Sequence, residues 1–239
     1  MSVLFEELDY RPTPMGALSL RRRRDLSSGG DIYEIKLNGE FLMSSRFTAA
    51  EIALARLGLA ALSGTSLDVI VGGLGLGYTA QAVLEHPQVS SLMVIDALPE
   101  VIEWHQQGLL PLGGELTSDP RCRLVLGNFF EGAASEAGFD ADHPGRRYHA
   151  ILVDIDHSPR NVLHPSHEAL YTTDGLTRLS AHLHPGGVFA LWSNDPPDDE
   201  FRQALQEVFA ASEARIVGFD NLRKDGEATN TVYVATRTG

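Results

Sequence analysis

Four glycines lie between an apolar run and a stretch of helical composition: Gly72, Gly73, Gly75 and Gly77. Glycine lets a backbone turn sharply and approach a ligand closely, and the helix that follows offers free N–H groups. Asp96 ends the next apolar run, 24 residues beyond Gly72, where a carboxylate can accept hydrogen bonds from an adenosine ribose. No Lys-Ser or Lys-Thr pair follows the glycines, so the segment is not a P-loop. The pattern favours a nucleoside ligand over a dinucleotide.

Two residues after a third apolar run add support to a nucleoside site. Asn128 and Phe129 follow the run Arg123–Leu126. The Asn128 amide can bond to the amino edge of an adenine, and Phe129 can stack nearby. A loop with a buried aromatic ring is the competing interpretation.

Two acids, Asp154 and Asp156, follow the apolar run Ile151–Val153. Open α/β sheets bind their ligands at the carboxyl ends of their strands. A charge that ends an apolar run is costly unless something pairs with it, which favours function over a turn or cap acid. Such a carboxylate can orient an ammonium substrate and take its proton as the nitrogen attacks.

Other chemistries fit these segments less well. His157, His164 and His167 lie near the two acids, but their spacing matches no compact zinc pattern, so we expect no metal. Ser158 lacks the Gly-x-Ser-x-Gly elbow of an α/β hydrolase. A serine nucleophile is therefore disfavoured, and the histidines are predicted to be loop residues.

Short apolar strands that alternate with helical stretches must position these residues. The predicted strands are Asp68–Val71, Ser91–Ile95, Arg123–Leu126, Ala150–Asp154, Val188–Trp192, Arg215–Phe219 and Thr231–Ala235. The predicted helices are Tyr78–Glu85, Pro99–Gln107, Ser166–His182 and Asp198–Ala211. This alternation predicts a mostly parallel α/β sheet. The last two strands have no room for a helix between them, so we expect an antiparallel hairpin with a turn at Asp225-Gly226.

The first 66 residues have a different, β-rich pattern. Alternating runs at Gly16–Leu20 and Ile32–Leu37 are followed by Asn38-Gly39, a strong hairpin signal. Arg21–Arg24 is interpreted as a solvated strand edge blunted by charge rather than a nucleic-acid patch. Thr48–Glu51 resembles a capping box that begins a linking helix. We expect a small N-terminal β unit at 1–66 and an α/β domain at 67–239.

Composition excludes several classes of protein. The chain has 239 residues, 43% of them hydrophobic, which is ordinary for a globular protein of one domain plus a small extension. No run is apolar enough to span a membrane, the first residues are acidic, and there is a single cysteine, so we expect a soluble, cytoplasmic protein. The net charge of −13 disfavours binding to nucleic acid. All of that excess lies in residues 67–239, with 11 basic and 24 acidic residues, which suits a cationic ligand.

The order of these parts resembles a known family. Residues 67–239 resemble a class I S-adenosylmethionine-dependent transferase, whose fold is Rossmann-like, with seven strands and an antiparallel last strand. The whole chain resembles the spermidine/spermine synthase (polyamine aminopropyltransferase) family. The segments that carry the resemblance are Leu37–Gly39, Thr48–Glu51, Val71–Gly77, Val153–Pro159, Leu170–Thr172 and Leu183–Val188.

The resemblance implies an activity and a set of roles. The family transfers an aminopropyl group from decarboxylated S-adenosylmethionine to a diamine or polyamine. Asp154 would then be the base, with Asp156 and Tyr171 on the acceptor side. Asp96 would hold the ribose, Asn128 and Phe129 would lie by the adenine, and the four glycines would shape the nucleoside loop. A homodimer is implied as well.

The chain differs from the family's motifs at four places. The family's loop acid, which recognises the aminopropyl amine, corresponds to Gly75, and its adenine-binding acid corresponds to Asn128. Its Tyr-His-Glu is here Ala49-Ala50-Glu51, and its Gln after Pro-Gly-Gly is Trp192. Two alternatives therefore stay open: a methyltransferase that uses intact S-adenosylmethionine, and a non-catalytic nucleoside-binding protein.

Overall fold

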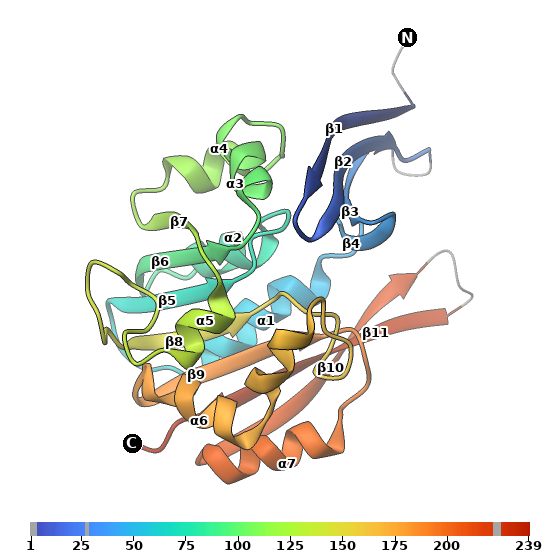
Figure 1. The fold of residues 1–239 in the computed structure, drawn as a ribbon. Helices are drawn as coiled ribbons and strands as arrows, with labels where there is room; N and C mark the ends of the chain where they lie inside the picture. Colours follow the sequence, from blue (N-terminus) through green and yellow to red (C-terminus); the bar gives the residue numbers. More distant parts are fainter. Residues whose placement is uncertain (1–3, 27–28, 222–225) are drawn as a thin grey trace.

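The computed structural model describes residues 4–26, 29–221 and 226–239, which form two β-sheets (Figure 1). The smaller sheet is antiparallel in the order β1-β2-β3-β4 and contains β1 (Phe5–Thr13), β2 (Gly16–Arg24), β3 (Asp31–Leu37) and β4 (Glu40–Ser44). The larger sheet has the order β10-β11-β9-β8-β5-β6-β7. Its strands are β5 (Leu67–Gly72), β6 (Val89–Asp96), β7 (Cys122–Leu126), β8 (Tyr148–Val153), β9 (Leu183–Ser193), β10 (Ala211–Asn221) and β11 (Gly226–Thr236).

The predicted fold class is confirmed. Strands β7, β6, β5, β8 and β9 pair in parallel, whereas β11 runs antiparallel to both β9 and β10. The seven predicted strands all occur. Each extends beyond its predicted range at one or both ends, by one to five residues, but β8 ends at Val153, one residue before the predicted Asp154. The predicted turn Asp225-Gly226 lies at the edge of a segment, 222–225, that is outside the described residues.

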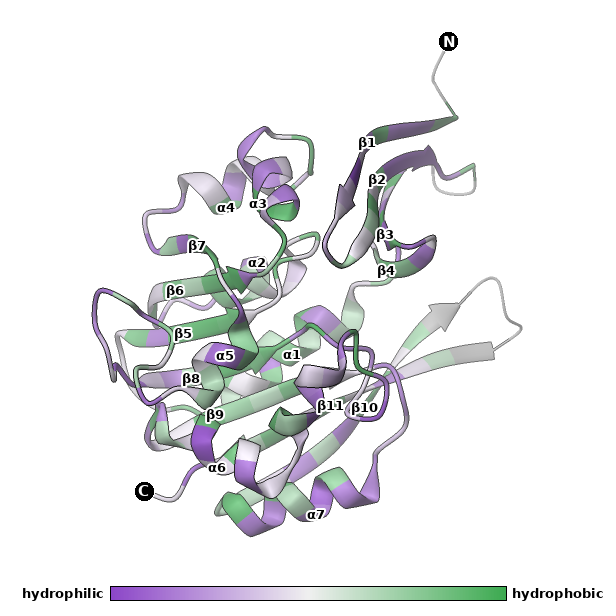
Figure 2. Ribbon diagram, in the orientation of Figure 1, coloured by the Kyte–Doolittle hydropathy of each residue, from purple (hydrophilic) through white to green (hydrophobic). Residues whose placement is uncertain are grey.

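Helices cover both faces of the larger sheet. They are α1 (Ala49–Ala60), α2 (Tyr78–Leu84), α3 (Pro99–Gln106), α4 (Gly113–Ser118), α5 (Phe129–Ala134), the 3-10 helix η1 (Pro165–Tyr171), α6 (Thr173–Ala181) and α7 (Asp199–Val208). Side chains of a strand alternate between faces. Val69 and Val71 of β5 therefore join the hydrophobic cluster under α1 to α4, while Ile70 joins the cluster under α5 to α7. Hydrophobic residues are concentrated on these central strands (Figure 2).

The N-terminal sheet packs against the larger unit near α3. Leu18, Leu20 and Ile35 belong to the same buried cluster as Val69. The Trp104 indole also donates a hydrogen bond to Asp9 at 2.7 Å. The division of the chain at residue 66 remains a prediction, because these contacts join the two sheets through one continuous core.

Three local predictions were wrong. Arg21–Arg24 is not a strand edge, because β2 lies between β1 and β3, and its arginines form ion pairs with acids of those strands. Thr48 precedes α1 but makes no capping hydrogen bond with its side chain, so there is no capping box. The predicted helix Ser166–His182 is two elements, because the extended backbone at Thr172 ends η1 and its hydroxyl accepts a bond from the first turn of α6.

Two smaller differences concern a strand that was not predicted and the end of a helix. Strand β1 was not predicted, because its apolar residues are interrupted by charges and by Pro12. The predicted helix Asp198–Ala211 ends at Val208, and Ala211 already pairs with Thr236. No helix among the described residues is long and apolar enough to cross a membrane.

Candidate active site

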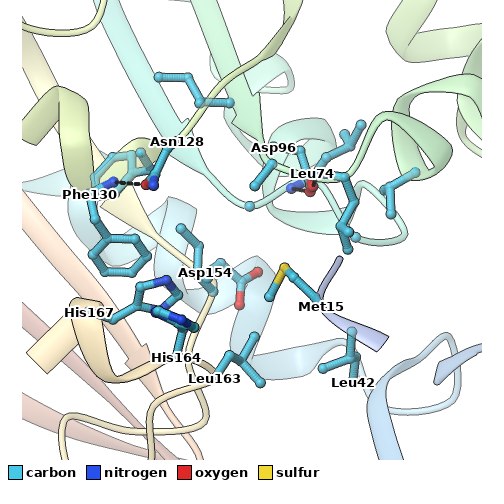
Figure 3. A pocket seen from close by; sticks show the side chains of 18 of the residues that line it. Met15, Leu42, Leu74, Asp96, Asn128, Phe130, Asp154, Leu163, His164 and His167 are labelled. Carbon is cyan, nitrogen blue, oxygen red and sulfur yellow. Dashed lines mark hydrogen bonds between the residues drawn. The ribbon is translucent and has the colours of Figure 1, made fainter. Parts of the chain in front are cut away.

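A cavity of about 620 Å³ lies between the carboxyl ends of the parallel strands and the N-terminal sheet. The sheet edge contributes the glycine loop, Asp96, Asn128 and Asp154. Met15, Ile35, Leu42 and Met43 come from the N-terminal sheet and its turns. Asp154 points toward the middle of the cavity, opposite Met15 and Leu42 (Figure 3).

The glycine loop is packed so closely that a Cβ added at any of its four glycines would lie under 3.0 Å from another atom. Gly73 has φ +92°, and a Cβ there would lie 2.1 Å from the backbone oxygen of Asp154. Gly75 has φ +47°, and its Cβ would lie 2.7 Å from the Met43 sulfur. Glycine at position 73 thus lets the loop pass directly beside the backbone of Asp154, just after the end of β8. The space on the cavity side of Gly75 is filled by Met43.

Asp96 ends β6 at the floor of the cavity. Its carboxylate accepts hydrogen bonds from the backbone N–H groups of Leu74 and Leu98, both at 2.9 Å. Burial raises the pKa of Asp96, and these N–H groups oppose that rise. The acid therefore links the glycine loop to the predicted ribose position.

Asn128 and Phe129 lie together at the start of α5 and both line the cavity. The Asn128 side-chain oxygen accepts bonds from the N–H groups of Phe130 and Glu131, and so caps the helix. Phe129 is buried, and a Cβ on Gly72 would lie 2.6 Å from its ring. Phe130 stacks on His167 with ring centroids 3.6 Å apart. The position predicted for the adenine is therefore bordered by a cluster of aromatic rings.

Glu51, which is buried, and Asp154, which is half-buried, form a pair of acids at the cavity. The Thr79 hydroxyl donates a hydrogen bond of 2.6 Å to Asp154. Burial raises the pKa of Asp154 to about 6, although the hydrogen bond from Thr79 lowers it. Burial and the nearby Asp154 charge raise the pKa of Glu51 to about 8. A cation between these two carboxylates would stabilise both in their charged forms.

Asp156 and Tyr171 lie behind the cavity wall rather than on it. Asp156 is buried and accepts bonds from the Tyr171 hydroxyl at 2.7 Å and the Leu163 N–H at 2.7 Å. Its other contact is Nδ1 of His167 at 2.8 Å. Burial and the Asp156 charge raise the pKa of Tyr171 well above its usual value. The structure brings both predicted residues together, and they reach the cavity through His167.

The sequence did not predict that Glu51, Thr79 and His167 contribute to this site. Glu51 was interpreted as a capping acid, but it faces the cavity from the first turn of α1. Thr79 follows the glycine loop and has no motif of its own. His167 was interpreted as a loop residue, and its partner Asp156 lies 11 residues before it. Asp154 and Asp156 both follow β8, which ends at Val153, so the alternation of strand side chains does not say which of the two acids faces the cavity.

The charge of the cavity wall has one sign. Its lining acids are Glu51, Asp96, Glu100, Glu131 and Asp154. Among the described residues, no Lys or Arg lines it, although three histidines do. Likewise, the described part of the chain contains no group of three or more residues arranged to hold a metal ion. Such a wall attracts a cationic ligand and repels a carboxylate.

Comparisons with known proteins agree with this geometry. No family model matches the chain. The chain is 33% identical, over 126 residues, to a polyamine aminopropyltransferase of Corynebacterium efficiens. That match covers 53% of this chain and 22% of the relative, so the matched segment spans less than a quarter of that protein's length.

Two solved structures are similar over almost the whole chain. The spermidine synthase of Thermotoga maritima matches with a TM-score of 0.71 and 18% identity, over 97% of this chain and 72% of that one. A spermidine synthase in complex with the transition-state analogue AdoDATO matches with a TM-score of 0.73 and 18% identity, over 97% and 73%. The chain therefore has the fold of the spermidine synthases, and its predicted resemblance to the polyamine aminopropyltransferases is confirmed.

Proposed function

We propose that the protein transfers an aminopropyl group from decarboxylated S-adenosylmethionine to an amine, and releases methylthioadenosine. The observation that carries this proposal is the pair of acids Asp154 and Glu51, both with a raised pKa, in a cavity whose other charged lining residues are also acids or histidines. Buried carboxylates are costly unless they meet a cation, and both substrates of this reaction are cations. The names of the similar proteins support the same reaction.

The nucleoside part of the donor would lie along the sheet edge. Asp96 would accept bonds from the ribose hydroxyls, while Asn128 and Phe129 would border the adenine. The four glycines would let the loop approach the sulfur side of the donor. A donor without a carboxylate suits this wall, because none of its described lining residues is a Lys or Arg that would neutralise one.

The transfer is a single displacement. The acceptor ammonium gives one proton to Asp154, and the lone pair that this frees on nitrogen attacks the methylene carbon next to the sulfonium. The new N–C bond forms as the C–S bond breaks. The electron pair of that bond goes to sulfur, which becomes a neutral thioether. Asp154 takes the proton that the nitrogen loses, a role that its raised pKa favours. The cavity contributes mainly alignment of the two substrates.

Asp156 and Tyr171 would act as positioning residues in this scheme. Their hydrogen bonds fix the segment after β8 and the ring of His167, which stacks on Phe130 beside the adenine position. Three donors around one buried carboxylate make this segment rigid. This rigid segment and the hydrogen bond from Thr79 would together fix the orientation of Asp154.

Calorimetric titration with three nucleosides tests the donor. Decarboxylated S-adenosylmethionine and methylthioadenosine are expected to bind more tightly than intact S-adenosylmethionine. Mass spectrometry of a reaction with the decarboxylated donor and an amine should then show an acceptor heavier by one aminopropyl group. Binding that favours the intact donor, with no aminopropyl product, would overturn the proposal. Failure of all three nucleosides to bind would point to a protein that has kept only the scaffold.

One observation favours a methyltransferase as the second candidate. Met43 occupies the space beside Gly75, where the family's loop acid would face the aminopropyl amine. Without that acid, the site has one fewer contact that distinguishes the decarboxylated donor from the intact one. The titration above separates the two candidates.

Acceptor class, assembly and location also belong to the proposal. The resemblance implies a diamine or polyamine acceptor and a homodimer. The acidic composition favours a small cationic partner over nucleic acid, and a cytoplasmic location was expected from the sequence.

A further inference from the structure

The base of the nucleoside would lie beyond the carboxyl end of β7. Asp96, the predicted ribose acid, ends β6, and β6 pairs in parallel with β5 on one side and with β7 on the other. The glycine loop follows β5, so a base attached to a ribose at Asp96 would extend the other way, toward Asn128 and Phe130. The amino group of an adenine needs a hydrogen-bond acceptor there, because an unpaired polar group in a closed site is costly.

Asn128 was the partner for the adenine amino edge predicted from the sequence, but its side-chain oxygen is already in use. It accepts hydrogen bonds from the backbone N–H groups of Phe130 and Glu131, which take up its two lone pairs. The amide nitrogen donates to the Glu131 carboxylate at 3.0 Å. Asn128 therefore holds the first turn of α5 and has no acceptor left for a base.

His167 has a free ring nitrogen beside this position. The residue lines the cavity from η1, and its ring stacks on that of Phe130 with centroids 3.6 Å apart (Figure 3). Nδ1 contacts the buried Asp156, whereas Nε2 has no hydrogen-bond partner among the described residues and is not a fully buried atom. The side chain is 10% exposed, and that exposed part opens onto the cavity.

Asp156 determines whether Nε2 of His167 donates or accepts. The carboxylate accepts bonds from the Tyr171 hydroxyl and the Leu163 N–H, each at 2.7 Å, so it also takes the hydrogen of His167 Nδ1, at 2.8 Å. Three donors satisfy this carboxylate without a charged imidazole. In a neutral imidazole that carries its hydrogen on Nδ1, Nε2 is an acceptor. An acceptor here matches an exocyclic amino group and opposes a carbonyl oxygen.

We infer that His167 recognises the base of the nucleoside, by accepting at Nε2 a hydrogen bond from the 6-amino group of a purine. Asp156 is a positioning residue in this scheme, because it fixes the hydrogen on Nδ1 and the direction of the ring. The inference rests on the proposed function and adds a specificity to it: the site selects 6-aminopurine nucleosides over 6-oxopurine nucleosides.

Three nucleosides that share a methylthioribose test this inference by calorimetry. At the 6-position of the purine, methylthioadenosine has an amino group, methylthioinosine an oxygen, and methylthiopurine riboside a hydrogen. Methylthioadenosine should bind roughly tenfold more tightly than the purine riboside and roughly 100-fold more tightly than methylthioinosine. Equal binding of methylthioadenosine and methylthioinosine would overturn the inference and leave the aminopropyl transfer standing. Failure of all three to bind would overturn both.

Two substitutions separate Nε2 from the contact with Asp156. His167→Asn places an amide where Nδ1 lies and removes Nε2, so methylthioadenosine should bind roughly tenfold more weakly, with the purine riboside unchanged within about twofold. His167→Gln places an amide near Nε2, and its oxygen and NH₂ can exchange places, so the amino and oxo nucleosides should bind within about threefold of each other. An equal loss for all three nucleosides in both variants would indicate a structural role and contradict the inference.

His143→Asn is the matched control. His143 also contacts an aspartate through Nδ1, Asp140 at 3.2 Å, but it is exposed and does not line the cavity, so the variant should keep the wild-type order of affinities. Glu131→Gln tests the other acceptor near this position, an exposed acid that lines the cavity. Loss of the amino preference in Glu131→Gln, with none in His167→Asn, would overturn the inference. Thermal unfolding of each variant shows whether the fold is retained.

Discussion

The two walls of the active-site cavity differ in what holds them. On the wall formed by the larger sheet, hydrogen bonds hold the carboxylates in place. Asp96 accepts one from the N–H of Leu74, and Asp154 accepts one from the Thr79 hydroxyl. On the N-terminal wall, Met15, Leu42 and Met43 offer apolar contacts that follow the shape of whatever binds. Under the proposed function, this difference would give the chemical step to the first wall and the choice of substrate to the second.

The first prediction tests Asp154, the proposed base on the wall formed by the larger sheet. Asp154→Asn should lower kcat for aminopropyl transfer by about 100-fold or more, because the amide cannot take the proton of the attacking amine. Binding of methylthioadenosine should change by less than roughly tenfold, or about 1.4 kcal/mol. Steady-state kinetics and calorimetry measure the two effects.

Asp195→Asn is the control for this variant, since Asp195 is an exposed acid just beyond β9 and outside the cavity lining. It should behave as the wild type does. Normal turnover by the Asp154→Asn protein would remove Asp154 from the mechanism and assign the base to another group.

The second prediction uses the pH dependence of stability. The raised pKa of Glu51 means that the folded, ligand-free protein prefers the protonated acid. That contribution to stability is complete below the pKa of the unfolded chain, near 4.5, and is lost as pH rises toward about 8. Between pH 6 and 8 the free energy of unfolding should fall by on the order of 2 kcal/mol from this group.

Glu51→Gln should flatten this loss, so the variant should be more stable than the wild type at pH 8, by roughly 5 °C in Tm. Glu85→Gln, at an exposed position, is the control and should keep the wild-type pH profile. A wild-type slope in the Glu51→Gln protein would show that Glu51 is not protonated in the fold. A cationic ligand should reverse the preference and bind more tightly as pH rises.

The sheet wall was largely predictable from the sequence, and the N-terminal wall was not. Apolar runs that end in Gly72, Asp96 and Asp154 place polar groups at the carboxyl ends of neighbouring parallel strands, a rule that needs no tertiary detail. The neighbours of Met43 depend instead on how one sheet packs on another. Local patterns contain no information about such contacts.

Two errors show the same limit, one in the candidate site and one in the N-terminal sheet. Glu51 has the spacing of a capping acid, and only the packing of α1 on the larger sheet turns it toward Asp154. Arg21–Arg24 has the composition of a solvated edge, but β1 covers that side of the strand and supplies acids to pair with it. In both cases a tertiary contact decided between two locally acceptable interpretations.

The third prediction concerns the support behind the sheet wall. Tyr171→Phe removes one of the three donors to the buried Asp156 carboxylate. The free energy of unfolding should fall by about 1.5–3 kcal/mol, as is typical of a hydrogen bond to a charged group. Urea denaturation measures this loss. A positioning role further predicts a lower kcat with an unchanged KM for the donor, whereas a purely structural role would leave kcat as it is.

The last prediction has the smallest effect and tests how the two walls meet. Gly75→Asp alone should change donor affinity by less than about threefold, because the Met43 sulfur lies 2.7 Å from the new Cβ and must move first. In a Met43→Ala background the aspartate has room to face the aminopropyl amine. Affinity for the decarboxylated donor should then rise by roughly tenfold over Met43→Ala alone, with no gain for the intact donor.

Calorimetry on the four proteins of this double-mutant cycle gives the coupling between the two positions. Additive effects would mean that Met43 does not control the space beside Gly75, and that the choice of donor lies with the sheet wall alone. A coupled gain would show that one apolar side chain of the N-terminal sheet governs a charge contact made by the glycine loop. The N-terminal wall would then select the donor as well as the acceptor, although it contributes no group to the bond that breaks.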